Sequence, residues 1–237
     1  MPVMQDVEPT TAAAAHVASG DVRTLEVRRL GIVGYEDGLA LQRSLVEDRR
    51  AGRTGDVLLL LQHPPVITLG VKGDGGRANI IATDARLAEL GIVVHETGRG
   101  GDVTYHGPGQ IVGYPILDLR PDRCDVHRYV RDVEEVMIRV CAAYGLTAGR
   151  MKGLTGTWVG ADKIGAIGVR ISRWITSHGF AFNVSTDLDH FRLIVPCGIS
   201  DRGVTSLERA TGTGVSMTDA EDAIVREFAA VFDRRVT

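Results

Sequence analysis

The chain has 237 residues, of which 44% are hydrophobic, and this excludes a disordered protein because a substantial core can be buried. Lys and Arg total 27 against 30 Asp and Glu, so the formal net charge of −3 offers no strong attraction to nucleic acid. The longest strongly apolar run, Val57 to Leu61, is far shorter than the roughly 20 residues that a membrane helix needs. We therefore expect neither nucleic-acid binding nor a membrane span.

The N-terminus and the cysteine content favour a cytoplasmic protein. The first twenty residues carry Asp6 and Glu8 but no Lys or Arg, unlike the basic start of a secretory signal. Three cysteines, Cys124, Cys141 and Cys197, are an odd number that suits a reducing compartment better than a disulfide scaffold. Cysteines and histidines show no Cys-x-x-Cys or His-x-x-x-His spacing, so no metal site is predicted.

The chain is expected to fold as one domain behind a short tail. Residues 1–22 mix Pro, Thr, Ala and Gly without periodicity, which predicts a mobile tail. Residues 23–237 contain no linker or repeat, so we expect them to form a single domain.

The first half of this domain is predicted to contain strands interrupted by two helices. Apolar periodicity predicts a strand through residues 25–30, a helix ending at Ala51-Gly52 and a short helix over 84–90. Further strands are predicted over 57–61, 66–69, 92–95 and 110–119. The strands at 57–61 and 66–69 are separated only by His63-Pro64-Pro65, which suggests a buried hairpin-like pair.

The second half has the clearest signals. Apolar residues recur at helical spacing from Val126 to Tyr144, with Asp125 as the N-cap and Gly145 as the stop. Three strands over 154–159, 163–171 and 175–184 predict an antiparallel meander. A last helix is predicted to begin at Thr218, capped by its hydroxyl with Glu221. Because strands occur in blocks between helices, we predict an α+β fold with a mixed or antiparallel sheet and flanking helices.

Two segments contain more glycine than a turn or strand requires. The stretch from Gly98 to Gly109 packs five glycines into twelve residues, and it matches neither G-x-G-x-x-G nor the ATP-binding P-loop. A long exposed loop is the simplest alternative for this stretch. In Lys163 to Val169, small residues interrupt a good strand, which usually marks close approach of a ligand or another backbone.

Cys197 is the best-placed nucleophile, because it sits in a turn between Pro196 and Gly198. Cys141 falls beside the apolar stripe of the long helix, where packing is the simpler explanation. A nearby ammonium would lower the pKa of a thiol, so Lys163 and Cys197 are a candidate pair. A lone lysine at a strand end is more often merely solvated.

Histidine is the rival base. His106 in the glycine-rich stretch and His178 before Gly179 are the best placed for a Cys-His pair, although either could simply be a hydrogen-bonded or exposed histidine. His63 is followed by two prolines and is interpreted as a turn residue.

The sequence resembles the lipoyl(octanoyl) transferase family. Five blocks carry the resemblance, in the family's order: Gln62-His63-Pro64-Pro65, Arg99 to Gln110, Lys163 to Val169, His178 to Asn183, and Pro196-Cys197-Gly198. The similarity extends from about Leu25 to the final helix, and the N-terminal tail is the main departure.

This resemblance implies the fold of the lipoate and biotin protein ligases and an octanoyl transfer that begins protein lipoylation. It implies octanoyl-acyl carrier protein as donor, no ATP or other cofactor, and as acceptors the lipoyl domains of 2-oxoacid dehydrogenase complexes and the glycine cleavage H protein. Cys197 would form an acyl thioester, activated by Lys163. The residues around the acyl chain would be Arg99, Gly100, Gly101, Asp102, Val103, Thr104, Tyr105, His106, Ala166, Ile167, Gly168, Gly179, Phe180 and Ala181.

Three other functions remain open from the sequence. An ATP-dependent lipoate or biotin ligase would share the fold and differ in needing a nucleotide. A thioesterase would pair Cys197 with His106 or His178 and release the free acid. A non-catalytic lipoyl-binding module is disfavoured by the presence of both Cys197 and Lys163.

Overall fold

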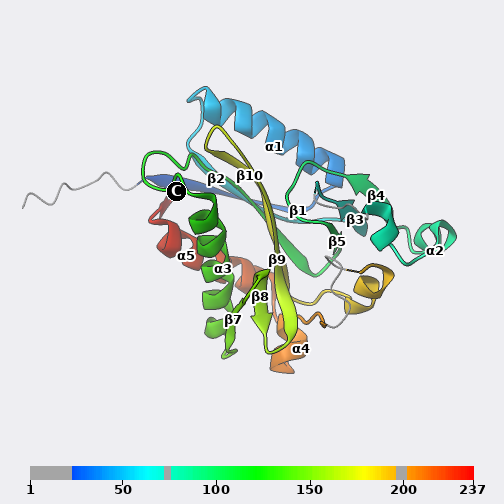
Figure 1. Cartoon of the computed structure of the whole chain (residues 1–237). Helices are drawn as coiled ribbons and strands as arrows, with labels where there is room; N and C mark the ends of the chain where they lie inside the picture. The colour runs from blue at the N-terminus through cyan, green and yellow to red at the C-terminus, as the bar shows by residue number, and fades with distance from the viewer. Residues whose placement is uncertain (1–22, 72–75, 196–201) are drawn as a thin grey trace, which may run out of the picture.

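The computed structural model of the chain describes residues 23–71, 76–195 and 202–237 (Figure 1). Its α-helices are α1 (Tyr35–Arg50), α2 (Asp84–Glu89), α3 (Val126–Ala143), α4 (Leu207–Thr211) and α5 (Met217–Phe232), and two 3-10 helices are η1 (Gly76–Asn79) and η2 (Leu188–Leu193). The predicted tail, residues 1–22, and the candidate nucleophile Cys197 lie outside the described residues.

Within the described residues, eight strands form one large mixed sheet. In spatial order they are β11 (Arg235–Val236), β1 (Thr24–Ile32), β2 (Asp56–Gln62), β6 (Gln110–Ile116), β10 (Ile175–Asn183), β9 (Asp162–Ser172), β8 (Leu154–Val159) and β7 (Ala148–Met151). Strand β1 runs parallel to β11 and β2, and the remaining pairs are antiparallel.

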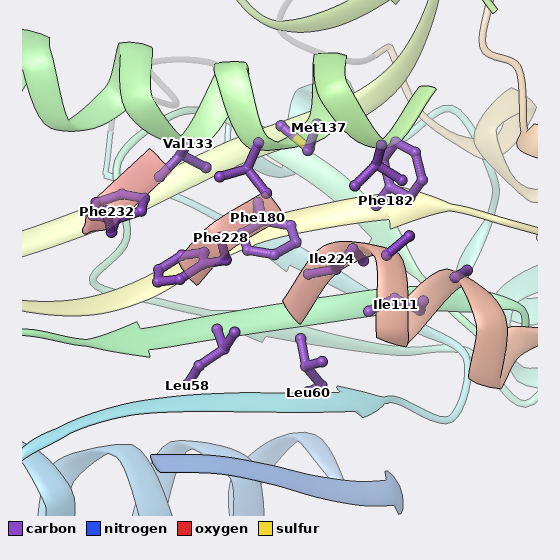
Figure 2. Close-up of a cluster of buried hydrophobic side chains, with 14 of the residues drawn as sticks. Leu58, Leu60, Ile111, Val133, Met137, Phe180, Phe182, Ile224, Phe228 and Phe232 are labelled. Atoms are coloured by element: carbon purple, nitrogen blue, oxygen red, sulfur yellow. The ribbon is translucent and has the colours of Figure 1, made fainter. Parts of the chain in front are cut away.

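Helices cover both faces of this sheet (Figure 1). Helices α3 and α5 pack on one face, where Phe180 and Phe182 of β10 meet Val133 and Phe228 of the helices (Figure 2). The opposite face carries α1, whose Leu45 belongs to a second apolar cluster with side chains of β2 and β6. Strand β2 is buried on both faces as a result, which explains its unbroken apolar sequence.

A second sheet of three strands lies beside the large one, in the order β4 (Val93–Glu96), β3 (Val66–Leu69) and β5 (Val103–His106). Strand β3 is parallel to β4 and antiparallel to β5. Its own small core includes Ile67, Leu87 and Ile194, so α2 and the residue after η2 close this unit. The segment from Val103 to His106 is a strand, so the alternative of a long exposed loop does not hold for this part of the glycine-rich stretch.

The predicted α+β fold is confirmed, as is the long helix with its cap. Asp125 accepts a hydrogen bond of 3.0 Å from the backbone N–H of Arg128, and Gly145 after the helix has the positive φ of 74° that favours glycine. Strands β8, β9 and β10 pair in the predicted meander. The sequence did not reveal the short elements β7, β11, α4 and η2.

The predicted hairpin of 57–61 with 66–69 is wrong. Strand β2 pairs with β1 and β6 in the large sheet, whereas β3 pairs with β4 and β5 in the small one. The link His63-Pro64-Pro65 takes the chain out of one sheet and into the other, since proline cannot donate to a ladder. Short spacing suggested pairing, but β1 and β6 occupy both edges of β2 and leave none for β3.

The start of the last helix is also corrected. The N-cap is Ser216, two residues before Thr218: its hydroxyl accepts a hydrogen bond of 3.3 Å from the backbone N–H of Asp219, and the helix begins at Met217. Both Ser216 and Thr218 precede an acidic residue by three positions. The earlier start includes Met217, which packs against the core formed by α3 and α5.

Candidate active site

A cavity of about 610 Å³ is lined by residues of both sheets, α1, the first turns of α3, η2 and the segment 202–204. The sequence-predicted stretches 99–104, 166–168 and 179–181 all contribute to its wall, and so does Lys163. His106 lines it as well. The structure thus brings together, around one cavity, residues far apart in the sequence that the family resemblance assigns to the acyl chain.

The glycine-rich segments meet through their backbones. The N–H of Gly100 donates a hydrogen bond of 3.0 Å to the carbonyl of Val169 in β9. A Cβ atom at Gly168 would lie 2.9 Å from the carbonyl oxygen of Gly100 and 3.0 Å from Cδ of Arg99. Glycine is required at position 168 because the backbone of Gly100 passes against β9 there. Small residues within a strand often mark such a close approach.

Arg99 is a buried guanidinium that anchors this crossing. Its side chain donates to the hydroxyl of Thr68 from Nε at 3.1 Å and from Nη2 at 2.8 Å, and Nη2 also donates to the Thr68 carbonyl at 2.7 Å. Nη1 donates to the carbonyl of Gly100 at 3.1 Å. The permanent charge of Arg99 is therefore fixed at the cavity wall by strand β3, where it acts on every titratable neighbour.

Tyr105 is the exception among the predicted acyl-chain residues, since it belongs to the small core and not to the cavity wall. Its hydroxyl lies 2.8 Å from Nδ1 of His190, and its ring centroid is 5.5 Å from that of Phe191. Burial raises the pKa of Tyr105 to about 12. Successive residues of a strand face opposite sides, so Tyr105 holds η2 in place while Thr104 and His106 line the cavity.

His63, which follows β2 and precedes the two prolines, is part of a buried polar cluster. Nδ1 lies 2.7 Å from the carbonyl of Val33, which only accepts, so Nδ1 carries the proton. Nε2 consequently accepts from the hydroxyl of Tyr114 at 2.8 Å. Burial lowers the pKa of His63, and it also raises the pKa of Tyr114 well above its ordinary value.

His106 and His178 both line the cavity as neutral imidazoles. Burial, reinforced by His63 and Arg99, lowers the pKa of His106 to about 3. Burial and then Arg99 and Arg170 lower the pKa of His178 to about 4. A base with so low a pKa holds almost no proton at pH 7, so neither histidine is suited to take one from a thiol.

The conformation of His178 is unusual for a strand residue. Its φ is 54°, in the left-handed region, and its backbone N–H donates a hydrogen bond of 2.7 Å to Oε1 of Gln42 in α1. Its ring lies 6.3 Å from that of Tyr114, centroid to centroid. Such backbone strain, of the order of 1 kcal/mol, is retained mainly at functional sites. It places this imidazole within the same cluster as His63 and His106.

Lys163 lies near the start of β9, at the edge of the cavity. Its backbone N–H donates to the carbonyl of Gly203 and its carbonyl accepts from the N–H of Thr205, both at 3.0 Å. Its Nζ is 4.8 Å from the ring centroid of Trp158. The wall that carries the lysine is therefore bonded directly to residues 203–205, which follow the candidate nucleophile in the sequence.

The two cysteines within the described residues, Cys124 and Cys141, lie outside the cavity. Cys141 is fully buried in α3, and desolvation raises the pKa of its thiol to about 12. Cys124 is exposed, and its sulfur lies 3.6 Å from the carbonyl of Leu119. Neither is among the residues that line the cavity.

Other kinds of site were also considered. Within residues 23–71, 76–195 and 202–237, no three His, Cys, Asp or Glu side chains gather as the ligands of a metal ion would. None of the helices in the described part of the chain has the length and apolarity to cross a bilayer.

Sequence reasoning missed several residues of the site. Tyr35 and Tyr114 line the cavity beside the histidines, and Trp158 faces Lys163. A tyrosine within the wholly buried stretch 110–116 was a usable signal, because its hydroxyl must find a partner. No feature of the sequence pointed to Trp158, because this residue is aligned with Lys163 only through an irregular strand pairing.

The chain matches known proteins over most of its length. The family model of the lipoyl protein ligase A/B catalytic domain matches residues 34–229. An octanoyltransferase from Myxococcus xanthus is 56% identical over 90% of this chain and 60% of that protein. Another, from Acidobacterium capsulatum, is 52% identical over 90% of this chain and 92% of its own length.

A solved structure shows the same fold. The bipartite lipoate protein ligase of Thermoplasma acidophilum superimposes with a TM-score of 0.66, covering 91% of this chain and 85% of its own. At 18% identity this likeness concerns the fold alone. From the family model and the close relatives together, the chain belongs to the lipoyl protein ligase A/B catalytic family and, within it, to the octanoyltransferases, which are acyltransferases.

Proposed function

We propose that this octanoyltransferase moves an octanoyl group from the thioester of octanoyl-acyl carrier protein to a lysine of lipoyl domains, by way of an acyl thioester on Cys197. The observation that carries the proposal is the place of Lys163. It lines the cavity, and its backbone is hydrogen-bonded to Gly203 and Thr205, which follow Cys197 closely in the sequence. An ammonium beside a thiol favours the thiolate, which is the reactive form.

In the first step the Cys197 thiolate attacks the thioester carbonyl of the donor. A new carbon–sulfur bond forms to Cys197, the bond to the donor sulfur breaks, and the Lys163 ammonium gives its proton to the departing thiolate. Backbone N–H groups of the glycine-rich wall would hold the oxyanion that forms in between.

In the second step the amine of the acceptor lysine attacks the enzyme-bound thioester. A carbon–nitrogen bond forms, the Cys197 thiolate leaves, and the proton of the amine passes to neutral Lys163. This restores the starting ion pair. Because the thioester is already activated and an amide is the more stable product, neither step needs ATP.

The acceptor class is supported by the solved relative. The Thermoplasma acidophilum ligase is described together with its E2 lipoyl domain. We extend this to the present chain and propose lipoyl domains as acceptors, including those of 2-oxoacid dehydrogenase complexes and the glycine cleavage H protein.

A thioesterase with a Cys-His pair is the weaker alternative. It would need His106 or His178 as base, but their pKa values of about 3 and 4 leave each imidazole a poor proton acceptor for a thiol of pKa about 8.5.

Intact-mass spectrometry after incubation with octanoyl-acyl carrier protein tests the proposal. We expect one added octanoyl group without ATP, none with Cys197→Ala, and an undiminished adduct with Cys124→Ser as the matched control. Adding a lipoyl domain should discharge the adduct onto that domain. A full adduct on Cys197→Ala, or an adduct that forms only with ATP, would overturn the assignment.

A further inference from the structure

Lys163 faces Trp158 because of an irregularity in the pairing of β8 with β9. Thr157 is aligned with Gly165, but the next aligned pair is Trp158 with Lys163, so the register shifts by one residue between them. Without the shift, Ile164 would stand opposite Trp158. Bulges of this kind redirect side chains next to functional sites. The shift puts the lysine and the indole on the same face of the hairpin.

The contact between the two side chains is close, and it joins a buried indole to a half-buried lysine. Nζ of Lys163 lies 4.8 Å from the ring centroid of Trp158, within the roughly 6 Å at which a cation interacts with an aromatic face. Trp158 is only 3% exposed and lines the cavity. Indole is the strongest of the aromatic partners for an ammonium, and loss of water strengthens the attraction.

The position of the indole has a cost that packing alone does not explain. Nε1 of Trp158 is buried and has no hydrogen-bond partner within the described residues. An unpaired buried donor is destabilising, and phenylalanine would fill much of the same space without one. The strand next to the ring is also tied to α3, because the preceding residues Gly156 and Thr157 are hydrogen-bonded to Glu134.

We propose that Trp158 is a positioning residue for Lys163: its indole face holds the ε-ammonium at the cavity wall in the charged form. The inference rests on the proposed function, because it assigns to Lys163 the charge that favours the Cys197 thiolate. In the second step the same face would favour the return of the proton to Lys163 and so the re-formation of the ion pair.

Fluorinated tryptophan tests this without altering the shape of the side chain much. The chain has two tryptophans, Trp158 and Trp174, and three lysines, Lys72, Lys152 and Lys163. The protein for the test is the full chain with Trp174→Phe, Lys72→Arg, Lys152→Arg and Cys197→Ala, which leaves one indole and one lysine amine and removes the thiol. Tryptophan carrying from one to four ring fluorines is incorporated, and acetylation of Lys163 by acetic anhydride is followed against pH by peptide mass spectrometry.

Fluorine withdraws electron density from the ring face, so we expect the midpoint of the labelling curve to fall stepwise, by about one pH unit over the series. A midpoint that stays constant across the series would overturn the proposal. If Trp158 only fills space, withdrawing electron density from its ring leaves the protonation of Lys163 unchanged. As a second test, Trp158→Leu should lower the midpoint and Trp158→Phe should restore most of it. Equal midpoints in these two variants would count against the proposal.

Failure of this inference can be told apart from failure of the proposed function. The variant Lys163→Ala, with Cys197 present, is tested for adduct formation from octanoyl-acyl carrier protein. An undiminished rate would remove Lys163 from the reaction even if the fluorine series shifts its labelling. If the adduct is lost and the labelling midpoint stays constant, Lys163 keeps its role in the reaction and Trp158 is not its positioning residue.

Discussion

The buried carboxylate of Glu134 in α3 accepts a hydrogen bond of 3.0 Å from the backbone N–H of Gly156 in β8. This bond ties the long helix to the strand that carries Trp158. Arg131 and Arg150 lie 2.6 and 3.0 Å from the same carboxylate, so its charge is compensated although its side chain is fully buried. A helix residue thereby fixes the strand pairing that positions Lys163.

Replacing Glu134 with Ala should lower the free energy of unfolding by about 3 kcal/mol, because a buried N–H and two arginines lose their partner. Urea unfolding measures this. Glu135→Ala is the matched control: its carboxylate pairs with Arg139 and Arg150 near the surface, and its loss should cost less than about 1 kcal/mol. Equal losses in the two variants would contradict the proposed tie.

The crossing of Gly168 and Gly100 predicts that Gly168→Ala impairs the enzyme. The added methyl group would push the Arg99–Gly100 segment off β9, and displacement of a cavity wall by about 1 Å can reduce a rate about 100-fold. The rate of adduct formation from octanoyl-acyl carrier protein measures the effect. Gly149→Ala in β7 is the control, since nothing lies within 4 Å of its Cβ position, and it should leave the rate unchanged.

Acid should destabilise the protein through its neutral histidines. The pKa values of His106 and His178 are lowered to about 3 and 4, mainly by burial, against about 6.5 in an unfolded chain. Between about pH 4 and 6.5 the unfolded state binds more protons, so stability falls as the pH falls through this range. These two groups should together cost about 4 kcal/mol at pH 5 relative to pH 8.

Urea unfolding at pH 5 and pH 8 measures the loss of stability, and His178→Gln should reduce it by about 2 kcal/mol. Equal stability at the two pH values would show that folding does not lower the pKa of these imidazoles. Above about pH 8 both histidines are neutral in the folded and the unfolded states, so they add no slope there.

The thiols should differ in reactivity as their surroundings differ. In the native protein at pH 8, iodoacetamide should alkylate exposed Cys124 and spare Cys141, whose pKa is raised to about 12 by burial in α3. Peptide mass spectrometry identifies the labelled site, and unfolding in urea should expose Cys141 to the reagent. Labelling of Cys141 before unfolding would contradict its place in the core.

Several elements were predictable because local interactions define them. The helix from Val126 follows from its apolar period and the side chain of Asp125, both within a few residues along the chain. The N-cap of α5 was misplaced by two residues, because Ser216 and Thr218 offer the same local capping pattern and packing of Met217 favours the earlier one.

The site was only partly predictable. The glycine-rich segments around Gly100 and Gly168 signalled close backbone approach, and the structure places them against each other. The shared cluster of His63, Tyr114 and His178 was not visible, because it joins the residue that follows β2 to one residue each of β6 and β10. The proximity of these residues depends on the order of the sheet and, for His178, on a left-handed backbone.

The sequence by itself determined the longer strands and helices, the odd number of cysteines and the resemblance to a family, since these depend on residue type and spacing along the chain. The tertiary structure alone decided which strands pair when they are far apart in the sequence, and which of their side chains meet. It separated β2 from β3, and it aligned Trp158 with Lys163 through a one-residue shift. Strand pairing joins distant segments, and a shift of one residue exchanges the face of every side chain, so local sequence cannot fix it.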